Sequence, residues 1–257
     1  MLKQFLRFVA RPLPQGAKTA IWRSLIRLRY WIHTSLGKYP TILFKCYELL
    51  DLYQDRVVGK HSEVVIDGFP RSASTFAYYA FQVAQGHPIN IAYHLHVPAQ
   101  IIRACELQRP TLVLIRDPRE AVSSLIVREP YMSVKACLKR YLVFYKALEA
   151  YRDHFILADF REVTTDFGHV IKRLNEKYRT HYALFEQTED EMTQVMMALR
   201  QRDQKYGGGE LQSYASNPTK ERFKKRVDFS DCQKLLRQCQ QLYERYHSDI
   251  ASGAHGK

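Results

Sequence analysis

The chain has 257 residues, which is enough for one α/β domain with a sizeable core. Its 39 Lys and Arg residues outnumber its 26 Asp and Glu residues, and the resulting net charge of +13 favours anionic ligands. No stretch reaches the ~18 apolar residues of a membrane-spanning helix, and the five scattered cysteines lack metal-binding spacing. We therefore expect a cytoplasmic protein with reduced thiols and no metal site.

The first 60 residues precede the regular α/β pattern, and we interpret them as a helical segment that packs on or precedes the core. Residues 1–11 are basic and amphipathic but lack the apolar region of a secretory signal. Residues 21–32 mix arginines with tryptophan and aliphatic side chains. This segment either contacts an anionic membrane surface or packs its arginine stems over the core. The α/β domain is expected to cover residues 61–257.

The apolar run Val64, Val65 and Ile66 predicts a central parallel strand. Gly68 is expected to allow a tight turn, and residues 72–75 open a helix that continues through residues 76–84. A strand, a loop and a helix N-terminus gather unpaired backbone N–H groups and the positive end of the helix dipole around an anion. This stretch therefore predicts a phosphate-binding loop.

A pair of histidines follows the next predicted strand. Residues 89–93 predict that strand, and Pro98 begins a helix that extends to Leu107. His94 and His96 thus lie at a strand's C-terminal end, where open α/β sheets bind ligands. An imidazole with an ordinary pKa of about 6.5 suits a general base at neutral pH. We interpret His96 as the base and His94 as a second polar contact or an alternative base.

A further buried strand is predicted at residues 112–115. Asp117 is expected to cap the helix that follows, and Glu120 to complete a capping box. Arg116 ends the strand, and Ser124 lies eight residues further along. A guanidinium suits a phosphate because its planar fork donates two parallel hydrogen bonds. We therefore expect Arg116 and Ser124 to reach one phosphate.

The alternation of helices and strands continues to the end of the chain. The predicted elements are a long helix at residues 133–152, a strand at 154–159, a helix capped by Asp166, a helix at 189–205, a glycine hinge at 207–209, a basic segment at 213–226 and a final helix at 230–247. This order predicts a three-layer α/β/α domain with a central parallel sheet.

Two of these segments resemble one family. Residues 70–75, Pro-Arg-Ser-Ala-Ser-Thr, resemble the 5′-phosphosulfate loop of the sulfotransferases that use 3′-phosphoadenosine 5′-phosphosulfate (PAPS), with Ala73 where that family usually has glycine. The segment from Arg116 to Ser124 resembles the part of these enzymes that binds the 3′-phosphate. His96, two residues before Pro98, resembles the catalytic histidine of the cytosolic members. The resemblance covers about residues 63–174.

The resemblance implies a P-loop NTPase-like sulfotransferase fold and transfer of a sulfuryl group from PAPS to a hydroxyl acceptor. It implies His96, or His94, as the base and Arg71 as the group that stabilises the departing 5′-phosphate. The implied PAPS contacts are Arg71, Ser72, Ala73, Ser74, Thr75, Phe76, Arg116 and Ser124. Lys220 and Arg222 either close the 3′-phosphate site or belong to a solvated basic face. A sulfuryl group carries less charge than a phosphoryl group, so no metal is expected.

Two other functions stay open. The first is an atypical P-loop kinase that uses ATP and Mg²⁺, with Asp117 as a metal carboxylate. In the kinase template the second glycine and the lysine are replaced here by Ala73 and Ser74, so Arg71 would supply the positive charge of the lysine. The second is a non-catalytic protein that binds phosphate or an anionic surface. No nucleic-acid-binding module is recognisable, so no such partner is expected. The positive charge favours an anionic acceptor, but the sequence does not define its class.

Overall fold

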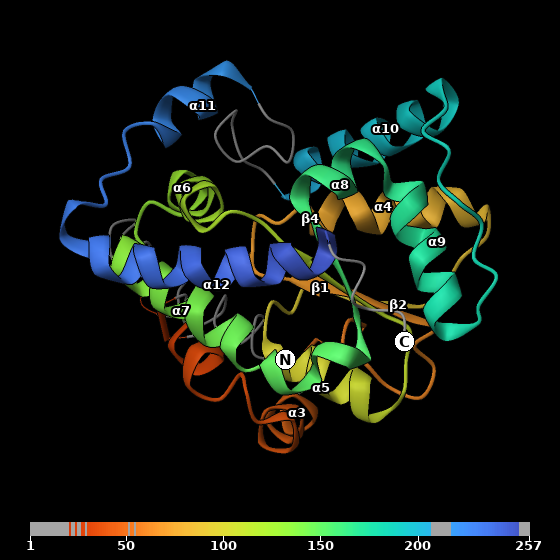
Figure 1. The fold of residues 1–257 in the computed structure, drawn as a ribbon, viewed down its shortest axis with the longest axis horizontal. Helices are drawn as coiled ribbons and strands as arrows, with labels where there is room; N and C mark the ends of the chain where they lie inside the picture. Colours follow the sequence, from red (N-terminus) through yellow and green to blue (C-terminus); the bar gives the residue numbers. More distant parts are fainter. Residues whose placement is uncertain are drawn as a thin grey trace, which may run out of the picture.

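The computed structural model describes residues 21, 24, 27, 28, 30–50, 52, 53, 55–206 and 217–251. Its centre is a four-stranded parallel sheet in the order β2-β1-β3-β4 (Figure 1). The strands are β1 (Val64–Gly68), β2 (Ile91–Tyr93), β3 (Thr111–Ile115) and β4 (Ile156–Asp159). The helices are α3 (Pro40–Leu49), α4 (Ser74–Gln85), α5 (Pro98–Glu106), α6 (Pro118–Arg128), α7 (Val134–Lys146), α8 (Phe160–Thr165), α9 (Phe167–Tyr178), α10 (Glu189–Tyr206), α11 (Pro218–Lys224) and α12 (Gln233–Ala251).

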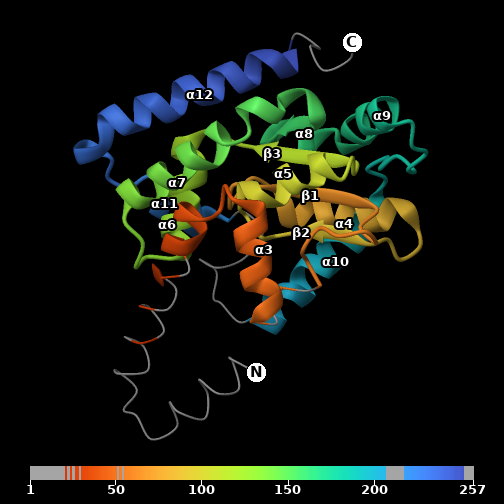
Figure 2. The same cartoon turned by 90° about the horizontal axis from the view of Figure 1, so that it is seen from below.

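Helices cover both faces of the sheet, because successive strand residues point to opposite sides. Val64 and Ile66 pack in one apolar cluster with residues of α4, α9 and α10. Val65 and Val113 pack in a second cluster with residues of α3, α5, α6, α7 and α12. Figure 2 shows the strands between α12 on one side and α10 on the other. The predicted α/β class with a parallel sheet and two helical layers is confirmed.

The strand order places a topological switch point between β1 and β3. The chain leaves β1 through α4 to reach β2 on one side, then crosses through α5 to β3 on the other side of β1. Open α/β sheets bind ligands at such a point, beyond the carboxyl ends of the strands. The loops that carry Arg71 and Arg116 follow these two strands, so both lie at the switch point.

Gly68 has a different role from the one the sequence suggests. It is the last residue of β1, with no positive φ angle, and it pairs with Leu114. A Cβ atom at this position would lie 2.2 Å from the carbonyl oxygen of Leu114. The close approach of β1 and β3 therefore requires glycine here.

Three predicted segments also differ in the structure. The long helix at 133–152 is α7 followed by a 3₁₀ helix at Glu149–His154, because the fully buried Leu148 and Phe155 turn the chain toward the sheet. Between the predicted strand at 154–159 and the helix that Asp166 caps, the structure has a further short helix, α8, and the backbone N–H of Arg161 in its first turn donates to Asp159. The basic segment contains α11, which Asn217 caps and Pro218 begins.

Part of the N-terminal segment packs against the core. Tyr30, Leu43 and Tyr47 are buried, and Leu43 and Tyr47 belong to the same apolar cluster as α5 and α7. Residues 1–20, which contain the amphipathic stretch, and the glycine run at 207–209 lie outside the described residues. Among the helices that the structure describes, none combines the length and the apolar character required to span a membrane.

Candidate functional site

A cavity of about 1400 Å³ lies at the carboxyl edge of the sheet. Residues that follow each of the four strands line it: Arg71 after β1, His94 and His96 after β2, Arg116 after β3 and Phe160 after β4. Arg71 and Arg116, which the sequence analysis places in two separate phosphate-type loops, thus line the same cavity. One cavity, rather than two, receives them.

The loop after β1 is held in an unusual backbone conformation. Arg71 has a φ angle of 74° and Ala73 one of 68°, in the left-handed region that only glycine adopts without cost. Ala73, Ser74, Thr75 and Phe76 line the cavity at the start of α4, but Ser72 is buried and does not line it. Strained non-glycine residues of this kind gather at ligand sites. Four of the five loop residues expected after Arg71 therefore border the cavity.

Arg71, Arg116 and Ser124 form one connected group. The Nε of Arg71 donates a hydrogen bond to Ser124 Oγ at 2.9 Å, and Nη1 of Arg116 donates to the carbonyl oxygen of Arg71 at 3.1 Å. The guanidinium of Arg116 also lies 3.8 Å from the centre of the Phe160 ring, which fixes its plane. Ser124 therefore orients Arg71 directly, whereas we expected it to act beside Arg116.

Helix α11 closes the cavity next to Arg116. Asp117 caps α6 as predicted, since its side chain accepts the Glu120 N–H at 2.9 Å. The carboxylate of Glu120 does not complete a capping box; it pairs with Arg116 at 3.2 Å and with Lys224 at 2.5 Å. Lys224 also pairs with Glu221 at 2.8 Å. The pair between Lys224 and Glu120 therefore joins α11 to α6.

Of the two basic residues expected near the 3′-phosphate, Lys220 lines the cavity and Arg222 does not. Lys220 is buried, and Arg222 is exposed on the other side of α11, because residues four apart share a helix face and residues two apart do not. The same periodicity brings Lys224, which the sequence analysis missed, into the cavity wall. Burial, together with the charges of Arg71 and Arg128, lowers the pKa of Lys220 to about 8.

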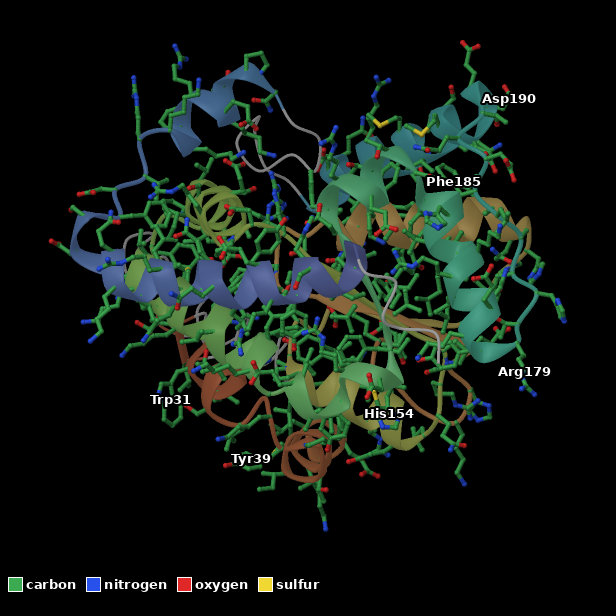
Figure 3. The ribbon with its side chains drawn as sticks, in the orientation of Figure 1. Trp31, Tyr39, His154, Arg179, Phe185 and Asp190 are labelled. Carbon is green, nitrogen blue, oxygen red and sulfur yellow. The ribbon has the colours of Figure 1, made fainter. Side chains whose placement is uncertain are left out.

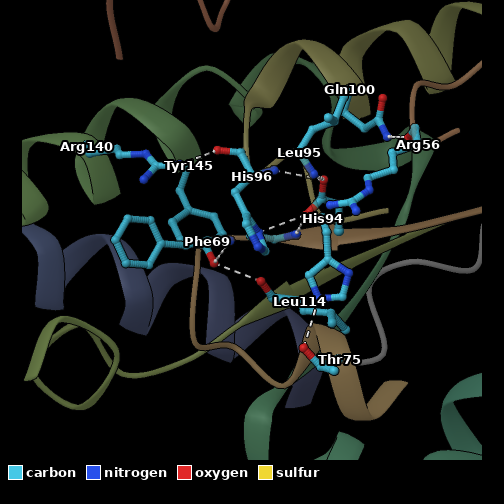
Figure 4. A network of polar contacts seen from close by, with 12 residues as sticks. Arg56, Phe69, Thr75, His94, Leu95, His96, Gln100, Leu114, Arg140 and Tyr145 are labelled. Carbon is cyan, nitrogen blue, oxygen red and sulfur yellow. Dashed lines mark hydrogen bonds and ion pairs between the residues drawn. The ribbon is translucent and has the colours of Figure 1, made fainter. Parts of the chain in front are cut away.

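His96, labelled in Figure 4, is held by a buried carboxylate. Its Nδ1 lies 2.7 Å from the carbonyl oxygen of Gly68 and 3.0 Å from Oδ1 of Asp67. Both oxygens accept, so Nδ1 carries a proton, and in the neutral ring the available electron pair is on Nε2. The imidazole is thereby prepared to take a proton at Nε2.

Asp67 is a further residue of this site that the sequence analysis did not select. It is fully buried, and its carboxylate also accepts the backbone N–H groups of Gly68, Leu95 and His96 at 2.8 to 3.0 Å. This set of bonds fixes the histidine loop to the end of β1. The sequence contains one indication of this role: Asp67 is a charged residue inside an otherwise apolar strand. A buried charge requires several hydrogen-bond partners, which indicates a structured polar site.

His94 has a different environment. Its Nε2 lies 2.9 Å from Oγ1 of Thr75, which connects it to the phosphate-type loop (Figure 4). Loss of solvent around the ring, and then the nearby His96, lower the pKa of His94 well below its usual 6.5. His94 is therefore neutral at pH 7 and positions Thr75.

Arg140 connects the histidine loop to the N-terminal segment. Its Nη2 donates to the carbonyl oxygen of His96 at 2.9 Å, and its guanidinium lies 4.3 Å from the centre of the Tyr30 ring. The sequence analysis missed this residue, because the apolar stripe of α7 indicated core packing only.

The cavity thus combines cationic groups at the ends of two strands with an imidazole whose orientation is fixed. Such a site can bind an anion with two phosphate-type groups and remove a proton from a second molecule. The chain matches no protein-family model and no curated protein. The function is therefore inferred from the geometry of this site.

Proposed function

We propose that the protein is a sulfotransferase that moves a sulfuryl group from PAPS to a hydroxyl acceptor. The observation that carries this proposal is that Arg71 and Arg116, from two adjacent strand ends, line one cavity and are linked by a hydrogen bond of 3.1 Å. A nucleotide with phosphate groups on both the 3′ and the 5′ position of its ribose needs two cationic groups in one cavity. A single phosphate needs only one.

The polar side chains fit such a donor. Arg71, Thr75 and the N-terminus of α4 would hold the 5′-phosphosulfate, because a helix start and its backbone N–H groups favour an anion. Arg116 and Lys220 would hold the 3′-phosphate, and the ion pair of Lys224 with Glu120 keeps α11 against this end of the cavity. The low pKa of Lys220 also fits, since a bound phosphate replaces the solvent that burial removed.

The chemistry follows from the state of the two histidines. Nε2 of His96 accepts the proton of the acceptor hydroxyl, whose oxygen attacks sulfur. The new O–S bond forms as the bond between sulfur and the bridging oxygen breaks, and that electron pair stays on the 5′-phosphate of adenosine 3′,5′-bisphosphate. Arg71 stabilises the charge that develops there. Asp67 keeps Nδ1 protonated and stabilises the imidazolium that forms.

The kinase alternative lacks a specific supporting contact. Asp117, its expected metal carboxylate, uses Oδ1 to cap α6 and does not line the cavity. The cationic groups also lie at two strand ends rather than along one triphosphate loop. We therefore keep the kinase only as an outcome of the test.

A thermal-shift titration separates the candidates, because a ligand that binds the native state raises its melting temperature. Adenosine 3′,5′-bisphosphate should stabilise the protein without metal, by about 2.7 kcal/mol at a concentration 100 times its Kd. Adenosine 5′-monophosphate is the control and should stabilise it much less. If only ATP with Mg²⁺ stabilises the protein, a kinase is favoured. If no nucleotide raises the melting temperature, the assignment as an enzyme of either kind is refuted.

His96→Gln tests the base. This variant should lose sulfotransfer from labelled PAPS while its melting temperature still rises with adenosine 3′,5′-bisphosphate, since Arg71, Arg116 and Lys220 are intact. Glutamine keeps a side chain of similar size but cannot accept the proton. Unchanged turnover would assign the base to another residue.

A further inference from the structure

The cavity is larger than a site for one ligand. Pockets for single small molecules usually measure about 300–1,000 Å³, against about 1400 Å³ here. Its polar half, at Arg71, Arg116 and Lys220, accounts for the nucleotide. The remaining half is lined mainly by Tyr30, Leu36, Leu43, Tyr47, Leu52 and Tyr53, which come from the N-terminal segment.

This apolar half lies next to His96. Leu95, the residue before it, packs in the same buried cluster as Leu43 and Tyr47. Arg140 bonds the carbonyl oxygen of His96 and stacks on Tyr30. Among the polar side chains of this half, His33 and Tyr47 bond to each other at 2.8 Å. The lining of this half is mainly aliphatic and aromatic, so a sugar with many hydroxyl groups would find few partners, whereas an apolar molecule would gain free energy by burial there.

The apolar half opens at an apolar surface. Leu28 and Leu50 both line the cavity and are 51% and 55% exposed, so they mark its mouth. Trp31 and Ile42 are also exposed, and Figure 3 shows Trp31 and Tyr39 at the periphery of the molecule. A small phenol would not need such an opening. An acceptor with a long apolar chain would lie along it.

We propose that the acceptor is an amphiphilic alcohol with an extended apolar chain. This proposal rests on the sulfotransferase function proposed above. Its hydroxyl lies at Nε2 of His96, and its chain runs past Tyr30 and Leu43 to the mouth at Leu28 and Leu50. The product is an alkyl sulfate ester, and the acceptor proton goes to His96. The positive charge of the protein then serves the nucleotide rather than an anionic acceptor.

A homologous series of primary alcohols, from butanol to decanol, tests the acceptor class with labelled PAPS. Each methylene that enters the apolar half should raise kcat/KM about fourfold, which corresponds to ~0.8 kcal/mol per buried CH₂ group. Galactose should be a poor acceptor. A constant kcat/KM across the series, or a preference for galactose in an active enzyme, would overturn the proposal.

Two neighbouring leucines provide a matched pair of variants. Leu50→Glu places a charge at the mouth of the cavity, whereas Leu49→Glu places the same charge on the adjacent residue, which is 77% exposed and does not line it. Both side chains are exposed, so both variants should fold. Leu50→Glu should flatten the dependence of kcat/KM on chain length, and Leu49→Glu should leave it unchanged. Equal effects would indicate a surface contact rather than a chain in the cavity, against the proposal.

Cys46 reports binding without any turnover. It is exposed and lines the apolar half, whereas Cys105, Cys137 and Cys239 are buried. Decanol should slow its alkylation by iodoacetamide several-fold, as followed by peptide mass spectrometry, and adenosine 3′,5′-bisphosphate should not. If decanol protects Cys46 from alkylation but no nucleotide stabilises the protein, the sulfotransferase function is refuted, whereas binding of an apolar ligand in this half of the cavity is supported.

Stabilisation by the nucleotide with neither protection of Cys46 nor turnover of any alcohol would refute the acceptor class alone. Slow alkylation of Cys46 in the full chain without ligand, unchanged by decanol, would show that the chain itself occupies the apolar half. That result would also overturn the proposal.

Discussion

The Nε of Arg71 and the Oγ of Ser124 are joined by a hydrogen bond of 2.9 Å, which links the loop after β1 to the helix after β3. A long arginine side chain loses conformational freedom when it binds an anion. Ser124 holds the guanidinium in place beforehand, on the wall of the cavity that Arg116 also lines. The site is therefore preorganised across two separate strand–helix connections.

Ser124→Ala should weaken the binding of adenosine 3′,5′-bisphosphate roughly 10- to 100-fold, since a hydrogen bond to a charged group contributes about 1.5–3 kcal/mol. Isothermal titration calorimetry would measure this loss. Ser123→Ala is the matched control, because Ser123 is equally buried but does not line the cavity. The same affinity in both variants would show that Arg71 needs no orienting partner.

Asp67→Asn should lower kcat by roughly 100-fold or more, because the amide retains an oxygen for the backbone donors but loses the charge that stabilises protonated His96. Affinity for adenosine 3′,5′-bisphosphate should stay within about twofold of the parent protein, since this carboxylate does not line the cavity. Steady-state kinetics and calorimetry on the same preparation would separate the two effects. A parallel loss of nucleotide binding would instead point to a general role in folding.

Ala73→Gly should raise the free energy of unfolding by about 1 kcal/mol, because alanine at a φ angle of 68° is strained and glycine is not. Urea denaturation monitored by circular dichroism would detect this change. Ala80→Gly, in the middle of the same helix α4, is the control and should lower stability by at least about 1 kcal/mol, since it also removes a buried methyl group. Destabilisation in both variants would mean that the loop is not strained.

Lys220 should make nucleotide binding depend on pH. Its pKa is lowered from 10.5 to about 8 in the folded protein, so folding disfavours its charge. The folded protein is therefore destabilised by this residue at low pH. Its free energy of unfolding falls as the pH falls from about 10.5 to 8, and the full contribution is present only above pH 10.5. A bound phosphate favours the charged form, so affinity should decrease as the pH rises above 8.

Calorimetric titrations of adenosine 3′,5′-bisphosphate at pH 7 to 9.5 would test this dependence. Lys220→Met should bind more weakly at pH 7 and lose most of the decrease at higher pH. Lys225→Met is the control, since Lys225 is exposed and does not line the cavity. A decrease that persists in Lys220→Met would assign the titration to another group.

Patterns between near neighbours were sufficient to predict most elements. The apolar runs of β1 and β3 and the helix caps of Asp117 and Asp166 are confirmed, because strands and caps depend on residues a few positions apart. The same local reasoning did not predict α11. Asn217 and Pro218 begin this helix, but they lie in a segment that was interpreted only by its basic residues. Local reasoning also could not say which faces of α11 meet the cavity.

The sequence by itself determined the α/β class, the two loops with their arginines, and the histidines at a strand end. Only the tertiary structure decided that Arg71 bonds Ser124, 53 residues away, that Asp67 holds His96, and that the N-terminal segment forms an apolar half of the cavity. These contacts follow from strand order and register, which bring distant residues together at one edge of the sheet. No local pattern carries that information, because propensity and periodicity describe only neighbours along the chain.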